Sequence, residues 1–371
     1  MQTRTHFFIF RYKLCKHFFK KGVNMDSFCH KIILKSREYY DFNNTYRLNL
    51  NSLSTFLVSK IISQNQAKSL IFSIQEQGSE SFIFTKMTYF KPPYVYFEKF
   101  NPSLEDFEYF VFDVGGTILD DKKMLQFQNI KTINELAKLG KKIILATSGS
   151  FFNFENYFEK INLNMPIICA NGAMIYDNNN FELTYGLEIQ KYIAYKIMNK
   201  CKELELAYYI FHDKGMAGID VQNSSAYKQN KEATGMKKES WVLNPEPNFF
   251  DDKKIYKVFV TFESNQNQKV NKLVRFCKQF NELHAVQTHS NFIDIGIKCS
   301  KGNALLKLQV DLNKTVVFGD SDNDLSLIEL ASLSFSHINA RPEVLEKVSY
   351  ISDKTNNDGW INEIVNDLFS E

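Results

Sequence analysis

The sequence contains no C-x-x-C pair and no long apolar run. Its 6 cysteines are scattered along the chain, so the sequence indicates neither a zinc site nor a disulfide framework, and a reducing compartment is expected. No stretch approaches the roughly 18 to 20 continuous apolar residues that a membrane-spanning helix needs. We therefore expect a cytoplasmic protein that does not cross a membrane.

The chain also lacks a strong charge of either sign. Lys and Arg number 45 against 42 Asp and Glu, which gives a net charge of +3. A surface that coats nucleic acid carries a large positive excess, so a nucleic-acid partner is not expected. The 371 residues, 44% of them hydrophobic, are more than one core usually supports, roughly 250 to 300 residues. We expect two or three folded units.

Residues 1–106 do not follow the pattern of the rest, and we assign them to an N-terminal extension. Residues 1–24 are basic and contain no acidic residue; we interpret them as an unstructured leader ahead of an internal start at Met25, with a targeting helix or a nucleic-acid arm as alternatives. Apolar spacing over 48–77 predicts two short helices, either a structural extension or a degenerate helix-turn-helix unit. The Pro-Pro pair within Phe90–Phe100 predicts a linker or a β-ribbon.

From residue 107 onward, apolar strand patterns alternate with helical ones. Strands are predicted at Tyr109–Phe112, Lys142–Thr147, Ile167–Cys169 and Thr315–Asp320, and helices at about 124–139, 153–161, from 301, at about 324–333 and at the C-terminus. This alternation indicates a parallel sheet, whose strands are apolar on both faces where helices cover them. Between 178 and 294 the pattern changes to alternating strands such as KIYKVFVTFES.

We therefore predict an α/β fold with a Rossmann-like parallel-sheet core. The core is formed by residues 107–177 and 295–371, and an inserted α+β domain at 178–294 interrupts it. Such an arrangement places the ends of the core strands at one edge of the sheet, where ligands usually bind.

Polar residues follow three of the predicted core strands. Asp113 follows FVF, Thr147 and Ser148 follow IILA, and GDSDND (Gly319–Asp324) follows VVF, while Lys301 begins a helix. At one edge of a parallel sheet these groups would form a single site. Carboxylates suit a hard cation such as Mg²⁺, hydroxyl and ammonium groups suit phosphate oxygens, and a carboxylate can attack phosphorus.

Each of these signals has a simpler structural interpretation. Asp113 also suits a turn before Gly-Gly, TSGS an ordinary loop, and Lys301 a solvated helix start. For GDSDND the rival is a calcium loop, which fails because the sixth position is Leu325 instead of glycine and the twelfth is Ala331 instead of glutamate. The functional interpretation is favoured because the signals fall at strand ends in one order.

That order of motifs resembles the haloacid dehalogenase superfamily, specifically its Cof-like branch of phosphatases with a large cap inserted into the core. The resemblance covers about residues 108–369. The family's D-x-D-G-T motif is here D-V-G-G-T from Asp113, followed by a strand-ending Thr147. The N-G-A turn, the S-K-G lysine motif, the G-D-x-x-N-D motif, the N-A pair and the D-G pair match residues 171–173, 300–302, 319–324, 339–340 and 358–359.

The resemblance implies a Mg²⁺-dependent phosphatase that hydrolyses a small phosphorylated metabolite through an aspartyl-phosphate intermediate. Asp113 would be the nucleophile, and Thr147 and Lys301 would assist it. The phosphoryl oxygens would be bound by Val114, Thr147, Ser148, Lys301 and Asn323, and Mg²⁺ would be bound by Asp113, the Gly115 carbonyl, Asp320 and, indirectly, Asp324. Phosphoryl transfer needs such positioning and charge neutralisation above all.

The sequence departs from the family at Gly115, where the second aspartate of D-x-D would protonate the leaving alcohol and activate water. Because the metal ligand at that position is a main-chain carbonyl, Mg²⁺ binding survives the change. A positioned acid or base contributes roughly 10² to 10⁴-fold, so we expect a slowed enzyme in which acyl and aryl phosphates suffer least. Asp120 and Asp121 are candidates to replace the missing acid. The alternative interpretation is that both belong to a solvated turn.

Two classes of function are consistent with this sequence. The first is a phosphatase whose rate is lowered, or whose substrate range is narrowed, by Gly115. The second is a catalytically degraded protein of the same fold that binds a phosphorylated metabolite or a partner. In the cap, the side chains considered for substrate specificity are His212, Lys214, Trp241 and Arg275. The sequence carries no indication of an oligomeric state.

Overall fold

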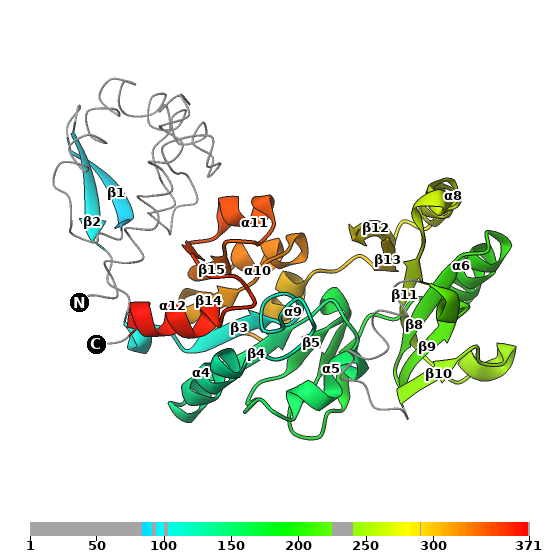
Figure 1. The fold of residues 1–371 in the computed structure, drawn as a ribbon, viewed down its shortest axis with the longest axis horizontal. Coiled ribbons are helices and arrows are strands. Elements are labelled where there is room, and N and C mark those ends of the chain that lie inside the picture. The colour runs from blue at the N-terminus through cyan, green and yellow to red at the C-terminus, as the bar shows by residue number, and fades with distance from the viewer. Residues whose placement is uncertain (1–83, 91–93, 100–102, 225–239, 290, 370–371) are drawn as a thin grey trace. The chain divides into compact units, whose positions relative to one another are not determined.

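The computed structural model describes residues 84–90, 94–99, 103–224, 240–289 and 291–369 (Figure 1). The predicted leader and the helix pair at 48–77 lie outside these residues. The predicted β-ribbon is confirmed, because β1 (Phe84–Phe90) pairs antiparallel with β2 (Tyr94–Lys99). No helix in the described part of the chain is long and apolar enough to cross a membrane.

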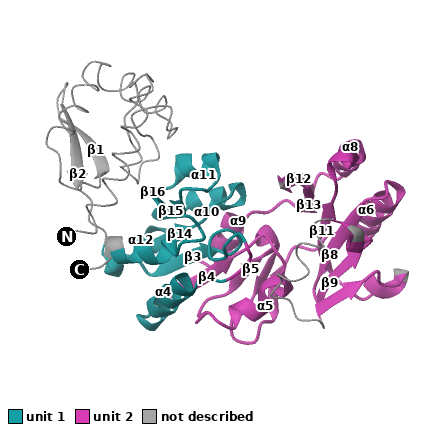
Figure 2. Ribbon diagram, in the orientation of Figure 1, with its two compact units in different colours: residues 1–121, 125–141, 310–371 teal, residues 122–124, 142–309 magenta. Residues whose placement is uncertain are grey.

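The chain divides into two compact units (Figure 2). The first consists of residues 1–121, 125–141 and 310–371, and the second of residues 122–124 and 142–309. The boundaries predicted from the sequence, at 177/178 and 294/295, fall within the second unit and stay a prediction.

In the first unit, four parallel strands lie in the order β16-β15-β14-β3. They are β3 (Tyr109–Asp113), β14 (Thr315–Phe318), β15 (Leu333–His337) and β16 (Tyr350–Ser352). Their side chains are buried on both faces, as predicted for a covered parallel sheet. Aromatic rings stack across the strands, with centroids 4.7 Å apart for Phe112 and Phe318 and 5.0 Å apart for Phe318 and Phe335.

The helices of the first unit are α4 (Phe127–Lys138), α10 (Leu325–Ile328), α11 (Pro342–Lys347) and α12 (Trp360–Phe369). α12 packs on α4 and buries Trp360 completely. The predicted helix over 324–333 is wrong in its second half, because α10 ends at Ile328 and Leu333 begins β15. The Ser332 N–H donates to the Leu312 carbonyl at 3.1 Å, which turns the chain into the sheet.

The second unit contains further core strands in the order β4-β5-β6-β7. They are β4 (Lys142–Ala146), β5 (Ile167–Cys169), β6 (Met174–Tyr176) and β7 (Leu183–Gly186). The β4 and β5 strands are parallel, whereas β6 and β7 add antiparallel pairings. Two helices, α5 (Phe151–Phe158) and α9 (Lys301–Lys307), belong to this part.

The remainder of the second unit is a mixed sheet in the order β10-β9-β8-β11-β13-β12. Its strands are β8 (Ala207–His212), β9 (Gly215–Ile219), β10 (Trp241–Leu243), β11 (Ile255–Thr261), β12 (Leu283–His289) and β13 (Phe292–Ile297). Two helices, α6 (Lys191–Glu203) and α8 (Asn267–Cys277), bury Ile193, Ile197 and Leu273 in its core. The predicted α+β insertion is thereby confirmed, and we call this part the cap.

Candidate active site

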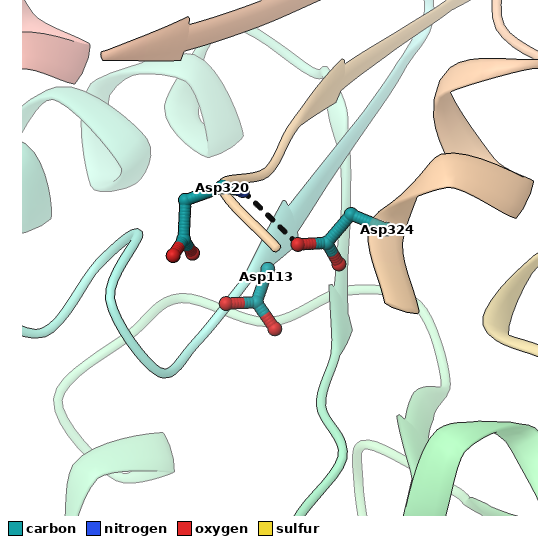
Figure 3. Close-up of side chains that lie close together, drawn as sticks. All are labelled: Asp113, Asp320 and Asp324. Carbon is teal, nitrogen blue, oxygen red and sulfur yellow. Dashed lines mark hydrogen bonds between the residues drawn. The ribbon is translucent and has the colours of Figure 1, made fainter. Parts of the chain in front are cut away.

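Three carboxylates of the first unit lie close together at the ends of two neighbouring strands. Because β14 pairs with β3 in parallel, with Phe318 opposite Phe112, the residues that follow both strands meet at one edge. One oxygen from each of Asp113, Asp320 and Asp324 lies within 4.8 Å of the other two. Figure 3 shows the three side chains beside the tip of β3. The sequence predicted these three residues as a group.

Hydrogen bonds orient the carboxylates. The Asp324 Oδ2 atom accepts the backbone N–H groups of Asp320 and Ser321, each at 3.0 Å. Asp320 accepts a hydroxyl proton at each oxygen, from Thr117 Oγ1 at 2.8 Å and from Ser321 Oγ at 2.9 Å. The motifs predicted no separate role for Thr117 and Ser321, although Thr117 lies in D-V-G-G-T and Ser321 in G-D-x-x-N-D.

The electrostatics of this cluster favour a bound cation. Asp113 and Asp324 are buried, with 4% and 0% of their surfaces exposed. Burial and the neighbouring Asp324 carboxylate raise the pKa of Asp320. A divalent ion would neutralise these crowded charges, and carboxylate oxygens are the ligands that Mg²⁺ prefers. The residues present therefore fit Mg²⁺.

The structure requires a glycine at only one of the two glycine positions that follow Asp113. Gly116 has a φ of +91°, and a Cβ there would lie 2.7 Å from Asp320 Oδ2, so a side chain at this position would collide with the carboxylate. Gly115 is exposed, and a Cβ there would meet no heavy atom within 4 Å. The absent carboxylate at Gly115 is therefore not imposed by lack of space.

The loop that contains these glycines is fixed from three sides. The Val114 carbonyl accepts the N–H groups of Ile118 and Leu119 at 3.2 and 3.0 Å. His337 Nε2 donates to the Gly116 carbonyl and Trp360 Nε1 to the Thr117 carbonyl, each at 2.9 Å. A rigid loop is what a carbonyl ligand at Gly115 requires.

The two carboxylates considered as substitutes for the missing acid take part in other contacts. Asp120 is 8% exposed and accepts a hydrogen bond from Gln126 Nε2 at 2.7 Å. Asp121 accepts hydrogen bonds from Asn356 Nδ2 and Asn357 Nδ2 at 2.9 and 3.0 Å. These contacts support a role for both aspartates in shaping the turn.

The other predicted site residue of the first unit is Asn323, which lies half-buried in a short 3₁₀ turn between Asp322 and Asp324. In the second unit, Thr147 directly follows β4 and is 1% exposed, and its Oγ1 accepts the Gly149 N–H at 3.1 Å. The adjacent Ser148 is half-buried.

Lys301 is the first residue of α9 and is fully buried. Ser300 caps this helix, because its Oγ accepts the Asn303 N–H at 3.1 Å. The turn at Gly172 packs directly against the start of α9: its φ is +97°, and a Cβ there would lie 2.3 Å from the Ser300 carbonyl oxygen. The N-G-A motif therefore supports the helix end from which Lys301 projects.

The side chains considered for specificity in the cap differ in exposure. His212 is 2% exposed and lies edge-on to the rings of Phe249 and Phe250. Lys214 pairs with Asp252 at 3.1 Å on the surface. The remaining two, Trp241 and Arg275, lie in β10 and α8.

Comparisons with known proteins identify the class. The model of the haloacid dehalogenase-like hydrolase family matches residues 110–364. Phosphatase YwpJ of Bacillus subtilis is 25% identical over 256 residues, which cover 62% of this chain and 90% of that protein. A haloacid dehalogenase-like hydrolase from Bacteroides thetaiotaomicron has a similar crystal structure, with a TM-score of 0.63 at 16% identity over 71% of this chain and 100% of that chain.

A sugar phosphatase of haloacid dehalogenase subclass IIB also shares the fold, with a TM-score of 0.55 at 15% identity over 70% of this chain and 97% of that chain. The chain belongs to the haloacid dehalogenase-like hydrolases, in the Cof-like branch. The family and fold class predicted from the sequence are confirmed. The family, with relatives that are phosphatases, assigns the chain to a class of phosphoric monoester hydrolases.

Proposed function

We propose that this chain is a Mg²⁺-dependent phosphatase that acts on a small phosphorylated metabolite through an aspartyl phosphate at Asp113. The observation that carries the proposal is the cluster of Asp113, Asp320 and Asp324, whose oxygens approach one another within 4.8 Å. Three buried or half-buried carboxylates at one sheet edge suit a cation that neutralises a phosphoryl group. The family membership of the chain supports the same reaction class.

In this proposal an Asp113 oxygen attacks phosphorus, the ester oxygen leaves, and water then hydrolyses the aspartyl phosphate. Asp113, the Gly115 carbonyl and Asp320 would bind Mg²⁺, and Asp324 would orient the loop. When bound, Mg²⁺ supplies charge neutralisation and alignment of the phosphoryl group. In the family's pattern, the phosphoryl oxygens would be bound by Val114 N–H, Thr147, Ser148, Lys301 and Asn323.

Gly115 affects the two chemical steps differently. An aryl leaving group departs without a proton, so the first step remains fast for aryl phosphates. Hydrolysis of the aspartyl phosphate needs an activated water in every case, so the second step loses roughly 10² to 10⁴-fold. We therefore infer that the aspartyl phosphate accumulates during turnover of aryl phosphates.

A second candidate is a protein that binds a phosphorylated metabolite without hydrolysing it. This candidate is favoured by Gly115, which lacks the acid. It is also favoured by the hydrogen bonds of Asp120 and Asp121, which hold these two possible substitutes for the acid in the turn.

Hydrolysis of p-nitrophenyl phosphate and of an alkyl phosphate, each with and without Mg²⁺, separates the two candidates. The phosphatase hydrolyses the aryl ester faster, and only with Mg²⁺, and Asp113→Asn abolishes this activity. If neither ester is hydrolysed while a phosphate analogue still binds, the phosphatase proposal is wrong and the second candidate stands.

A further inference from the structure

The cap contains a buried ion pair that the proposed reaction does not use. Lys257 of β11 and Asp294 of β13 are 3% and 2% exposed, and Lys257 Nζ lies 2.5 Å from Asp294 Oδ2. Burying two charges is costly, and replacing such a pair with apolar residues is often neutral or stabilising. Stability alone is therefore a weak explanation for this pair.

Both members of the pair are linked to the loop that carries Thr147. Lys257 Nζ donates to the Ser148 carbonyl at 2.9 Å. Asp294 Oδ2 accepts a hydrogen bond from Asn171 Nδ2 at 2.9 Å, and the Asn171 N–H donates to the Thr147 carbonyl at 3.1 Å. One cap ion pair therefore holds two consecutive carbonyl groups, one directly and one through Asn171.

The polar atoms of the pair find their partners inside the unit. Asp294 Oδ1 lies 3.2 Å from His284 Nε2, and its other oxygen contacts Lys257 and Asn171. Burial alone would raise the pKa of Asp294, but Lys257 and His284 outweigh it and hold this pKa below its ordinary value. A carboxylate that already accepts from three side chains is suited to positioning its neighbours instead of binding a ligand.

The backbone is strained at Ala170 and Asn171, next to the hydrogen bond between Asn171 and Asp294. Ala170 and Asn171 have φ values of 50° and 57°, in the left-handed region that non-glycine residues rarely adopt. Such a conformation persists only where the surroundings enforce it, and it concentrates at functional sites. The Asp294–Asn171 hydrogen bond is one of the contacts that hold these two residues, beside the backbone hydrogen bonds from Ala170 N–H to the Gly149 carbonyl and from Asn171 N–H to the Thr147 carbonyl.

We propose that Lys257 and Asp294 are positioning residues, which hold the Thr147–Ser148 loop in the geometry needed to bind the phosphoryl group. The kinetic consequence rests on the proposed phosphatase function, whereas the structural consequence, an ordered loop, does not. The cap of this chain thereby has a task besides covering the substrate: it shapes the loop that would bind phosphate.

The test compares two pairs of substitutions in the full chain. Lys257→Met with Asp294→Asn removes both buried charges at similar volume. The matched control, Lys269→Met with Glu205→Gln, removes a cap ion pair of 2.6 Å that is exposed. The readouts are kcat and KM for p-nitrophenyl phosphate and amide hydrogen exchange at Gly149 and Asn171.

The buried-pair variant is expected to lose about 10- to 100-fold in kcat, as for a displaced binding group. Exchange at both amides is expected to accelerate at least about tenfold relative to Ile197 in α6. The control pair leaves both readouts unchanged. If exchange and kcat per folded molecule match the control, the positioning proposal is wrong.

Two further outcomes are covered by the design. If the wild-type chain hydrolyses nothing, the phosphatase proposal fails, while the exchange rates still test the positioning of the loop. If the double variant does not fold, Asn171→Gly replaces it, because glycine accepts the left-handed φ and removes the link to Asp294. Unchanged Gly149 exchange in Asn171→Gly would overturn the proposal.

Discussion

Position 115 shows how one residue sets the expected substrate preference. A Cβ added there meets no heavy atom within 4 Å, so the backbone surroundings leave room for a side chain to begin at this position. Gly115→Asp is expected to raise kcat/KM for an alkyl phosphate by up to roughly 10² to 10⁴-fold, and kcat/KM for p-nitrophenyl phosphate much less, because kcat/KM reports the first step and only the alkyl leaving group needs a proton there. The ratio of the two kcat/KM values measures this difference.

The control for Gly115→Asp is Gly115→Asn, which has the same shape and no acid. Gly115→Asn should leave the ratio of the kcat/KM values for the two substrates as it is in the wild type. An equal gain in kcat/KM on both substrates in Gly115→Asp would count against the leaving-group argument. So would a gain in Gly115→Asn equal to that in Gly115→Asp.

His212 predicts a pH-dependent stability. Burial lowers the pKa of this histidine to about 4, against an ordinary value of about 6.5 in the unfolded chain. Between these values the unfolded chain binds a proton that the folded chain does not. The free energy of unfolding therefore falls as the pH falls from about 6.5 to 4, by roughly 3 kcal/mol in total at 1.36 kcal/mol per unit of pKa.

Urea unfolding at about pH 7 and about pH 4.5 tests this dependence. His212→Phe keeps an aromatic ring beside Phe249 and Phe250 and removes the titrating group. The variant should lose less stability than the wild type over the same pH range. Parallel losses in the two proteins would show that His212 is protonated equally in both states.

At the residue scale, sequence patterns predicted the carboxylates because each follows an apolar strand end. They did not predict Lys257. The alternation in KIYKVFVTFES suggested a half-exposed strand, but β11 lies inside the cap sheet and Lys257 is 3% exposed. Its partner Asp294 comes from a different strand, and no local pattern marks such a pair.

At the scale of elements, the turn at Gly172 is expected to be more sensitive to substitution than the turn at Gly140. Gly140 and Gly172 both have positive φ, +82° and +97°, but only at Gly172 would a Cβ lie 2.3 Å from a backbone oxygen. Gly140→Ala should cost about 1 kcal/mol through backbone strain alone. Gly172→Ala should lower the free energy of unfolding by about 1 to 3 kcal/mol more, through overpacking against α9.

Thermal unfolding of the two glycine variants measures the difference directly. Equal shifts in Tm would mean that α9 moves aside at little cost, and the proposed support of Lys301 by the N-G-A turn would be lost.

The parallel core strands predicted correctly are those with continuous apolar runs: β3, β4, β5 and β14. The sequence did not reveal β15 (LSFSH), because its two serines interrupt the apolar run. All five of its residues are buried, and its serines are satisfied by hydrogen bonds, from Ser336 Oγ to the Gly319 carbonyl at 2.7 Å and between Ser334 and Ser349. Polar residues can occupy a buried strand when such partners exist, and these partners lie far away in the sequence.

For the whole molecule, Mg²⁺ binding should stabilise the folded chain. A ligand at 100 times its Kd adds about 2.7 kcal/mol to the free energy of unfolding, so Tm should rise with Mg²⁺ concentration. Asp320→Asn should abolish most of this rise. Asp322→Asn, at an exposed neighbour outside the carboxylate cluster, should preserve it. Equal Mg²⁺ shifts in both variants would place the cation elsewhere.

The most direct measurement is the identification of the phosphorylated residue during turnover. The full chain is mixed with excess p-nitrophenyl phosphate and Mg²⁺, quenched in acid within the first turnovers, digested, and mapped by mass spectrometry. We predict one phosphoryl group on Asp113, which accumulates because Gly115 cannot activate water, and its loss in Gly115→Asp. Release of p-nitrophenol with Asp113 unmodified would contradict the account.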